Sequence, residues 1–241
     1  MLLLNRLDID SVARLCYLYQ MRIHIVQKDT SKLDHTAYIQ NAEKSGADLV
    51  CFAELSTSGI LYQQEPVKPL ETVLKSLKDH QTSIMLGLPY QVDETLYNCY
   101  MYYDRGQHQM YRKINLFCPM NEDKIYQAGD MPGLFKTRHG LLGVAICFDL
   151  RFPDLFKQLV SIGAEIIFVP AAFPQVRIED WKRLLVQMAV ENKVPVVGVN
   201  SVGRDSCNEF GGASMAVDAT GNVLVSANET EETVLEVEID L

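Results

Sequence analysis

One cysteine lies at a corner of the chain that suits a reactive thiol. Cys147 follows the apolar run 141–146, which predicts a strand, and precedes Pro153, which opens an amphipathic helix pattern. A thiol just before a helix N-terminus lies near the positive end of the helix dipole, so we expect a lowered pKa and a nucleophilic thiolate. Inert packing is the alternative, because free cysteines are among the most buried residue types. The segment therefore predicts a nucleophile only if other residues supply partners.

Three charged side chains could supply those partners. Glu54 ends an apolar run and begins the loop ELSTSG, Lys113 lies in YRKINLF, and Glu122 lies in NEDKIYQAG. Taken singly, each is more typical of a solvated surface charge or a capping residue than of a catalytic group. Whether they act on the thiol depends on whether the fold brings them to it.

The chain contains two similar halves. The segment 45–54 reads SGADLVCFAE and the segment 162–171 reads IGAEIIFVPA, and each predicts a helix end at glycine followed by an apolar strand. The order of the surrounding elements also agrees, because each half ends in an antiparallel strand pair with a tight turn. The other expected strands lie at 22–26, 83–88, 96–103, 141–146, 195–200 and 212–218, and expected helices include 67–77 and 178–188.

Two copies of such a unit predict two mixed sheets related by a pseudo-twofold, which face each other with helices outside. The C-terminal run, in which Val237 and Ile239 alternate with glutamates, predicts an edge strand with one wet face. In open α/β sheets, ligands bind beyond the carboxyl ends of strands. Since Glu54 follows a strand of the first half and Cys147 follows one of the second, we expect the two side chains to meet at one cleft.

In their order and local sequences, Glu54, Lys113 and Cys147 resemble the nitrilase superfamily of carbon–nitrogen hydrolases. The segments that carry the resemblance are FAELSTSG, YRKINLF, GVAICFDLRFP and the later run WKRLLVQMAVENKVPVVGVNSVG. The resemblance covers residues 21–241 and implies an α/β fold, an αββα four-layer sandwich with an internal pseudo-twofold. Residues 1–20 are then an N-terminal extension whose role stays open, because three leucines are too few for a signal-peptide core or a membrane span.

The resemblance also implies a role for each site residue. Cys147 would attack the amide carbon and form a thioester, Glu54 would act as the base, and Lys113 would stabilise the charged groups and the oxyanion. The backbone N–H of Phe148 would be a second oxyanion donor. Glu122 matches the family's second glutamate and would position substrate and lysine, with a solvated loop carboxylate as the alternative.

Two further residues bear on the substrate. The resemblance is closest to the ω-amidase-like branch, whose substrates are amides of dicarboxylic acids. The planar guanidinium of Arg151 suits a carboxylate, although an ion pair with Asp149 or Asp154 explains this residue equally well. Phe173 stands near the expected pocket, where related amidases often carry tryptophan. We therefore expect ammonia release from a small linear amide, in particular one that bears a carboxylate.

Composition bears on partners and compartment. The chain is 48% hydrophobic and 22% charged, as is typical of a globular protein, and a formal charge of −9 disfavours nucleic acid and anionic membranes as partners. The six cysteines form no CxxC pair, so we expect free thiols, a cytoplasmic location and no metal or other cofactor. The family resemblance implies a homodimer or a larger homo-oligomer.

Other functions stay open on the sequence alone. An N-carbamoyl amine or amino-acid hydrolase would use the same residues, whereas the family resemblance disfavours nitrile hydrolysis, because most branches of the family with so short a chain are amidases. A non-catalytic binding protein could keep the fold, but it would not need Glu54, Lys113 and Cys147 together. A redox-sensing thiol is disfavoured because no second cysteine near Cys147 is an obvious resolving partner.

Overall fold

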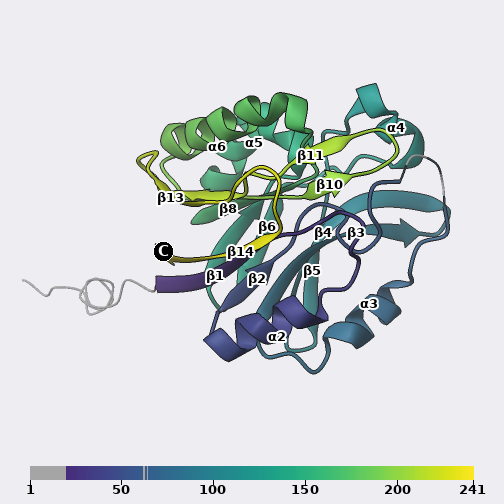
Figure 1. Ribbon diagram of the computed structural model, residues 1–241, viewed down its shortest axis with the longest axis horizontal. Helices are drawn as coiled ribbons and strands as arrows, with labels where there is room; N and C mark the ends of the chain where they lie inside the picture. The colour runs from purple at the N-terminus through teal and green to yellow at the C-terminus, as the bar shows by residue number, and fades with distance from the viewer. Residues whose placement is uncertain (1–19, 62, 64) are drawn as a thin grey trace, which may run out of the picture.

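The structure is a computed structural model, which describes residues 20–61, 63 and 65–241. Apart from Gln20, the predicted N-terminal extension lies outside the described residues. Within them, two six-stranded mixed sheets lie face to face (Figure 1). The first sheet has the order β14 (Thr233–Asp240), β1 (Gln20–Gln27), β2 (Leu49–Cys51), β3 (Ser83–Val92), β4 (Thr95–Asp104) and β5 (Gln107–Arg112). The second has the order β13 (Val223–Ser226), β12 (Met215–Val217), β9 (Val196–Asn200), β8 (Ile166–Ala171), β7 (Gly140–Val144) and β6 (Gly133–Thr137).

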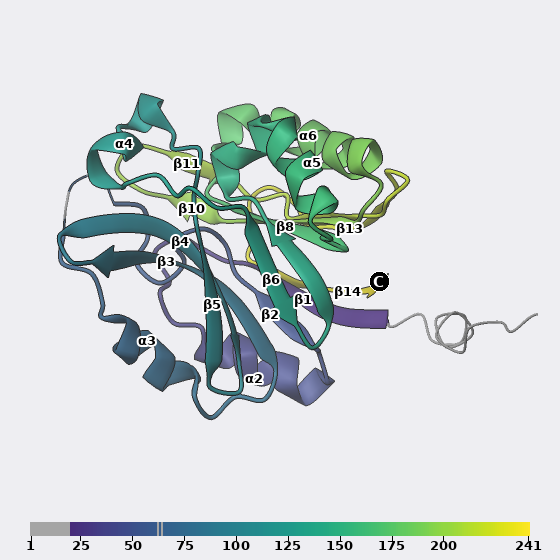
Figure 2. The same cartoon turned by 180° about the vertical axis from the view of Figure 1, so that it is seen from behind.

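Helices cover the outer face of each sheet, as both views show (Figures 1 and 2). Helices α2 (Thr36–Ser45) and α3 (Leu70–Leu77) pack on the first sheet, and α5 (Pro153–Ser161) and α6 (Ile178–Asn192) pack on the second. Short elements complete the described chain: the hairpin β10 (Val202–Arg204) and β11 (Glu209–Gly211), helix α4 (Glu122–Ile125), and the 3₁₀ helices η1 (Cys118–Met120), η2 (Cys147–Arg151) and η3 (Gln175–Arg177).

Three apolar layers hold this arrangement together. The central layer lies between the sheets and joins, for example, Ile23 and Met85 of the first to Val144 and Phe168 of the second, all fully buried. The two outer layers join each sheet to its own helices. Burial of apolar side chains in these layers is the main stabilising contribution to such a fold. The predicted αββα four-layer sandwich is confirmed.

The two sheets repeat one another strand by strand. In the first, β1, β2 and β3 run parallel and β4 and β5 follow antiparallel. In the second, β7, β8 and β9 run parallel and β12 and β13 follow antiparallel. The predicted duplication is therefore present in the structure.

The C-terminal strand completes the first sheet. Strand β14 pairs antiparallel with β1, in the place that β6 holds beside β7 in the second sheet. Val237 and Ile239 are buried, whereas Glu236 and Glu238 are exposed. The prediction of an edge strand with one wet face is confirmed.

Several predicted boundaries differ from the structure; for example, the strand expected over 212–218 is limited to Met215–Val217 as β12. Two further differences have a clear physical cause. The helix expected from Val67 begins at Leu70, because Pro69 disfavours a helical conformation at the residue before it. The strand expected over 141–146 ends at Val144 as β7, because the N–H of Ile146 donates to the carboxylate of Asp149 instead of to a neighbouring strand. No helix among the described residues has the length and apolar character that crossing a membrane requires.

Candidate functional site

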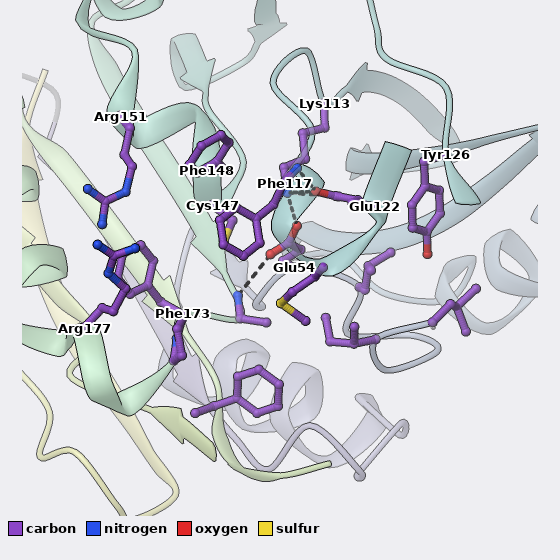
Figure 3. Close-up of a pocket in the computed structure, with 17 residues that line it drawn as sticks. Glu54, Lys113, Phe117, Glu122, Tyr126, Cys147, Phe148, Arg151, Phe173 and Arg177 are labelled. Carbon is purple, nitrogen blue, oxygen red and sulfur yellow. Dashed lines mark hydrogen bonds and ion pairs between the residues drawn. The ribbon is translucent and has the colours of Figure 1, made fainter. Parts of the chain in front are cut away.

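The loops that follow β2, β5, β7 and β8 line one pocket, so residues from both sheets contribute to it (Figure 3). All the residues predicted to form the site line this pocket: Glu54, Lys113, Glu122, Cys147, Phe148, Arg151 and Phe173. The structure therefore brings together, from distant parts of the sequence, the thiol, the carboxylates and the cation.

Glu54 is held where its loop crosses closely over β3. A Cβ atom at Gly87 of β3 would stand 2.2 Å from the backbone N of Leu55, so glycine is required at this crossing. The carboxylate of Glu54 is almost fully buried. Its Oε1 accepts a hydrogen bond from Nδ2 of Asn98 at 2.7 Å, and its Oε2 accepts one from the backbone N–H of Ala172 at 3.1 Å. Groups from both sheets therefore fix both oxygens.

Lys113 follows β5 and points at the same carboxylate (Figure 3). Its Nζ lies 2.8 Å from Oε1 of Glu54 and 2.9 Å from Oε2 of Glu122. Burial by itself lowers the pKa of Lys113, but the charges of Glu54 and Glu122 outweigh burial and hold this pKa well above its ordinary value. Lys113 is therefore a fixed, permanent cation.

Asn98 of β4 is a site residue that the sequence analysis missed. Its Nδ2 donates hydrogen bonds to Oε1 of Glu54 at 2.7 Å and to Oε1 of Glu122 at 2.8 Å, so one amide joins both carboxylates. The only sequence signal was an amide within an aromatic strand. Glu122 also accepts a hydrogen bond from the backbone N–H of Phe117 at 2.6 Å. The alternative of a solvated loop carboxylate at Glu122 is therefore wrong.

Cys147 opens η2 at a strained corner that follows β7. Its φ of 47° lies in the left-handed region, which non-glycine residues rarely adopt. Asp149 holds the corner, because its Oδ2 accepts hydrogen bonds from the N–H of Ile146 at 2.8 Å and from the hydroxyl of Tyr111 at 2.7 Å. Its Oδ1 accepts a third from the backbone N–H of Asn115 at 2.9 Å. Asp149 thereby links the thiol's turn to the loop that carries Lys113.

The helix dipole does not activate this thiol as the sequence suggested. Helix α5 begins only at Pro153, after the short 3₁₀ helix η2 that Cys147 itself opens, whereas the dipole effect is confined to the first helical turn. Burial raises the pKa of Cys147 well above its ordinary value, the negative charge of Glu54 raises it further, and Lys113 opposes both. The expected lowering of the pKa is therefore wrong. The resting group is a neutral thiol whose proton needs an acceptor.

Aromatic side chains form much of the pocket wall. The ring of Phe148 lies 4.9 Å from that of Phe117, and the ring of Phe173 lies 5.4 Å from that of Trp181. Tyr126 stands on the opposite side of the buried cluster from Phe173 (Figure 3). Its hydroxyl is buried and has no hydrogen-bond partner among the described residues. The wall is thus largely apolar around a charged centre.

Arg151 lines the pocket on the side away from Tyr126 (Figure 3). Its ion-pair partner is neither of the two aspartates that the sequence suggested. Its Nη2 lies 3.0 Å from Oδ2 of Asp180 on α6. Asp149 instead accepts a hydrogen bond from the N–H of Ile146, and Asp154 forms an ion pair with Lys157 of the same helix. The alternative of an ion pair at Arg151 is therefore present in the structure, but the suggested partners Asp149 and Asp154 were wrong.

The buried cluster has the parts that acyl transfer requires. Two carboxylates and one permanent cation line the same pocket as a neutral thiol, so Glu54 can accept a proton while Lys113 supplies positive charge for an oxyanion. In the described part of the chain, no three or more His, Cys, Asp or Glu side chains are grouped as metal ligands would be.

Comparison with known proteins points in the same direction. The family model described as carbon-nitrogen hydrolase matches residues 18–241. The chain is 30% identical over 225 residues to the 2-oxoglutaramate amidase of Bacillus subtilis, which covers 89% of this chain and 86% of that protein. It is also 30% identical over 235 residues to the N-carbamoylputrescine amidase of Oryza sativa, covering 84% of this chain and 78% of that one.

Solved structures share the fold. A mutant of the Nesterenkonia AN1 amidase, from the nitrilase superfamily, superposes with a TM-score of 0.82. The match has 22% sequence identity and covers 91% of this chain and 90% of that one. At this identity the likeness supports the architecture alone.

Proposed function

Because the chain belongs to the carbon–nitrogen hydrolase family, we propose that it is a thiol amidohydrolase that releases ammonia from a small linear amide bearing a carboxylate. The observation that carries the proposal is the buried ion pair of Lys113 and Glu54, 2.8 Å apart, in the pocket that Cys147 lines. Burying a base and a cation is costly, so their place beside a thiol favours catalysis over simple binding.

In the acylation half of the reaction, Sγ of Cys147 attacks the amide carbon while Glu54 takes the thiol proton. Lys113 and the backbone N–H of Phe148 stabilise the oxyanion of the tetrahedral intermediate. The C–N bond then breaks, and Glu54 returns the proton to the leaving nitrogen. Ammonia departs and the acyl group stays on Cys147 as a thioester.

In the deacylation half, Glu54 takes a proton from a water molecule that attacks the thioester carbon. The C–S bond breaks, the sulfur regains a proton, and the product leaves as a carboxylic acid. Glu122 and Asn98 act by position, since both contact the Lys113–Glu54 pair. The raised pKa of Cys147 makes Glu54 necessary, because little thiolate is present before the base acts.

Arg151 is the residue that would bind the carboxylate of the substrate. Arg151 lines the pocket and presents a guanidinium, which binds carboxylates in a planar, bidentate manner. Phe173 forms the wall beside it. The 2-oxoglutaramate amidase of Bacillus subtilis is named for an amide of a dicarboxylic acid, which agrees with this substrate class.

A second candidate is N-carbamoyl amine or amino-acid hydrolysis. The N-carbamoylputrescine amidase of Oryza sativa matches the chain at the same 30% identity. The same nucleophile and base would serve, but a cationic amine would be repelled by Arg151. The arginine therefore favours the carboxylate-bearing amide over the N-carbamoyl amine, whereas an N-carbamoyl amino acid, which also bears a carboxylate, is compatible with Arg151.

We also propose a homodimer in the cytoplasm. Phe152, Ile162 and Val190 are 38%, 43% and 46% exposed at the second helical layer, where a partner copy would cover them. The five cysteines of the described residues are free thiols, which suits a reducing compartment. Light scattering at micromolar protein, giving twice the chain mass, tests the dimer.

Ammonia release from a substrate panel tests the proposed activity. The panel contains glutaramate, its neutral analogue pentanamide, N-carbamoylputrescine and 4-cyanobutanoate. We expect the highest kcat/KM with glutaramate, loss of turnover in Cys147→Ala, and full turnover in the control Cys207→Ala, whose thiol is exposed outside the pocket lining. Preference for the carbamoyl compound would favour the second candidate. No turnover of any compound, or full turnover in Cys147→Ala, would defeat the proposal.

A further inference from the structure

A second arginine stands beside Arg151 at the pocket. Arg177 ends η3, directly before α6, and lines the pocket together with Arg151, which comes from η2 (Figure 3). Both guanidinium groups lie on the side of the pocket away from Tyr126 (Figure 3). Arg177 had no predicted role, because the residue lies far in the sequence from the motifs around Cys147 and Glu54.

One carboxylate is shared among three arginines here. Oδ2 of Asp180 lies 3.0 Å from Nη2 of Arg151 and 3.6 Å from Nε of Arg177, and Oδ1 lies 3.6 Å from Nη2 of Arg183. Three positive charges therefore surround one negative charge. Arg183 is not among the residues that line the pocket.

The remaining acidic groups of the pocket do not compensate this excess. Among the described residues that line it, the only carboxylates are Glu54 and Glu122, and both are bound to Lys113. Apolar residues of the lining contact the two arginines: Arg151 lies over the ring of Phe173, and the backbone N–H of Arg177 donates to the carbonyl of Pro174. Among the described residues, this end of the pocket therefore carries more positive than negative side-chain charge.

We propose that Arg177 is a specificity-determining residue, which together with Arg151 binds the carboxylate end of the substrate. The inference rests on the proposed function and goes beyond it, because it assigns selectivity to a residue outside the reaction centre. Asp180 is a positioning residue that holds both guanidinium groups toward one another. A substrate carboxylate then supplies the negative charge that Asp180 alone does not.

The exposure of the two arginine side chains limits how strongly they can favour a charged substrate. The side chain of Arg151 is 27% exposed and that of Arg177 is 51% exposed, so water and salt screen both. Because the binding group is remote from the reacting carbon, its loss acts on KM of charged substrates more than on kcat. We expect a moderate change in selectivity rather than loss of the reaction.

Matched variants test this proposal. Arg177→Gln removes the charge at the pocket, and Arg183→Gln removes a charge that has the same partner at the same 3.6 Å but lies outside the lining. We expect Arg177→Gln to lower the ratio of kcat/KM for glutaramate to kcat/KM for pentanamide about three- to tenfold, mainly through KM. Arg183→Gln should keep the ratio of the unchanged protein.

Calorimetric binding of glutarate, which lacks a scissile bond, separates this inference from the proposed function. Glutarate binding should weaken about three- to tenfold in Arg177→Gln and should depend on ionic strength less than in the unchanged protein. If glutarate binding is weaker in Arg177→Gln but the unchanged protein hydrolyses no amide, the carboxylate-binding role of Arg177 stands and the proposed amidase activity is refuted. An unchanged ratio and unchanged glutarate binding in Arg177→Gln, or equal losses in Arg183→Gln, would overturn the role of Arg177.

Discussion

The Nζ atom of Lys113 lies 2.8 Å from Oε1 of Glu54, and the two side chains are only 2% and 4% exposed. Removing one partner from a buried ion pair leaves an uncompensated charge, which is strongly destabilising. Each member of the pair has a further partner: Asn98 donates a hydrogen bond to Glu54, and Lys113 donates one to Glu122. The geometry of the proposed base and cation is therefore set by four side chains together.

Replacing Asn98 tests the link between the two carboxylates. Asn98→Leu removes the donor shared by Glu54 and Glu122, and we expect kcat to fall about 10- to 100-fold, the loss typical of one or two hydrogen bonds to charged groups. Asn98→Asp should be worse, because a third carboxylate would repel the first two. Steady-state kinetics with thermal unfolding as a folding check makes the measurement. Asn192→Ala, which removes a similar amide at the end of α6, is the control. A kcat of Asn98→Leu within twofold of the unchanged protein would refute the role of Asn98.

The pH dependence of Cys147 alkylation tests the charges around the thiol. Because burial and Glu54 raise the pKa of Cys147, its reaction with iodoacetamide should still accelerate above pH 9. Glu54→Gln removes a negative charge and should shift the profile to lower pH, whereas Lys113→Met should shift it to higher pH. Mass spectrometry follows the modification, in a background where the exposed Cys118 and Cys207 are replaced by serine. A plateau near neutral pH would contradict the neutral resting thiol.

Gly87→Ala tests the close crossing that holds Glu54. The new Cβ would stand 2.2 Å from the backbone N of Leu55, so the loop must move and kcat should fall at least about 100-fold. Gly198→Ala in β9 is the matched control, because its Cβ meets side chains of Leu185 and Trp181 rather than the site backbone. Both variants should lower the melting temperature, but only the first should lower kcat. Equal kcat losses in the two would show that strain alone, and not displacement of Glu54, causes the effect.

Lys28 gives a prediction about stability. Burial lowers the pKa of Lys28 to about 8, although nearby acids oppose the shift, and its Nζ donates to the carbonyls of Lys32 and Ser56. The folded-state pKa lies below the unfolded value, so between about pH 8 and 10.5 the unfolded chain binds more protons. The contribution of Lys28 to the free energy of unfolding therefore rises across this window, by up to about 3 kcal/mol.

Urea unfolding of the unchanged protein and of Lys28→Met at several pH values checks this sign. The difference in free energy of unfolding, unchanged protein minus variant, should increase as the pH rises from about 8 to 10.5. A difference that is constant or falls over this window would contradict the lowered pKa of Lys28.

The positions of Glu54 and Cys147 illustrate what could be predicted from the sequence. Each directly follows an apolar strand pattern, and the duplicated element order places those strands in facing sheets, so a shared cleft followed from topology alone. Glu122 required the family resemblance, because its local sequence is that of an ordinary charged turn.

Other features depend on contacts that no local pattern encodes. Asp180 pairs with Arg151 only because α6 packs beside η2, and the two residues are 29 positions apart. Asn98 could not be recognised as a site residue, since one amide in a strand is compatible with many environments. The thiol's pKa depends on its burial and on the charge of Glu54, so reasoning from the helix alone gave the wrong direction.

Intact-protein mass spectrometry of the quenched reaction with glutaramate tests the central claim most directly. A thioester at Cys147 should add the mass of the glutaryl group and appear in the unchanged protein within the first turnover. It should be absent from Cys147→Ala, which should also release no ammonia, and present in the control Cys207→Ala. Turnover without any adduct on Cys147, together with undiminished ammonia release by Cys147→Ala, would contradict the account.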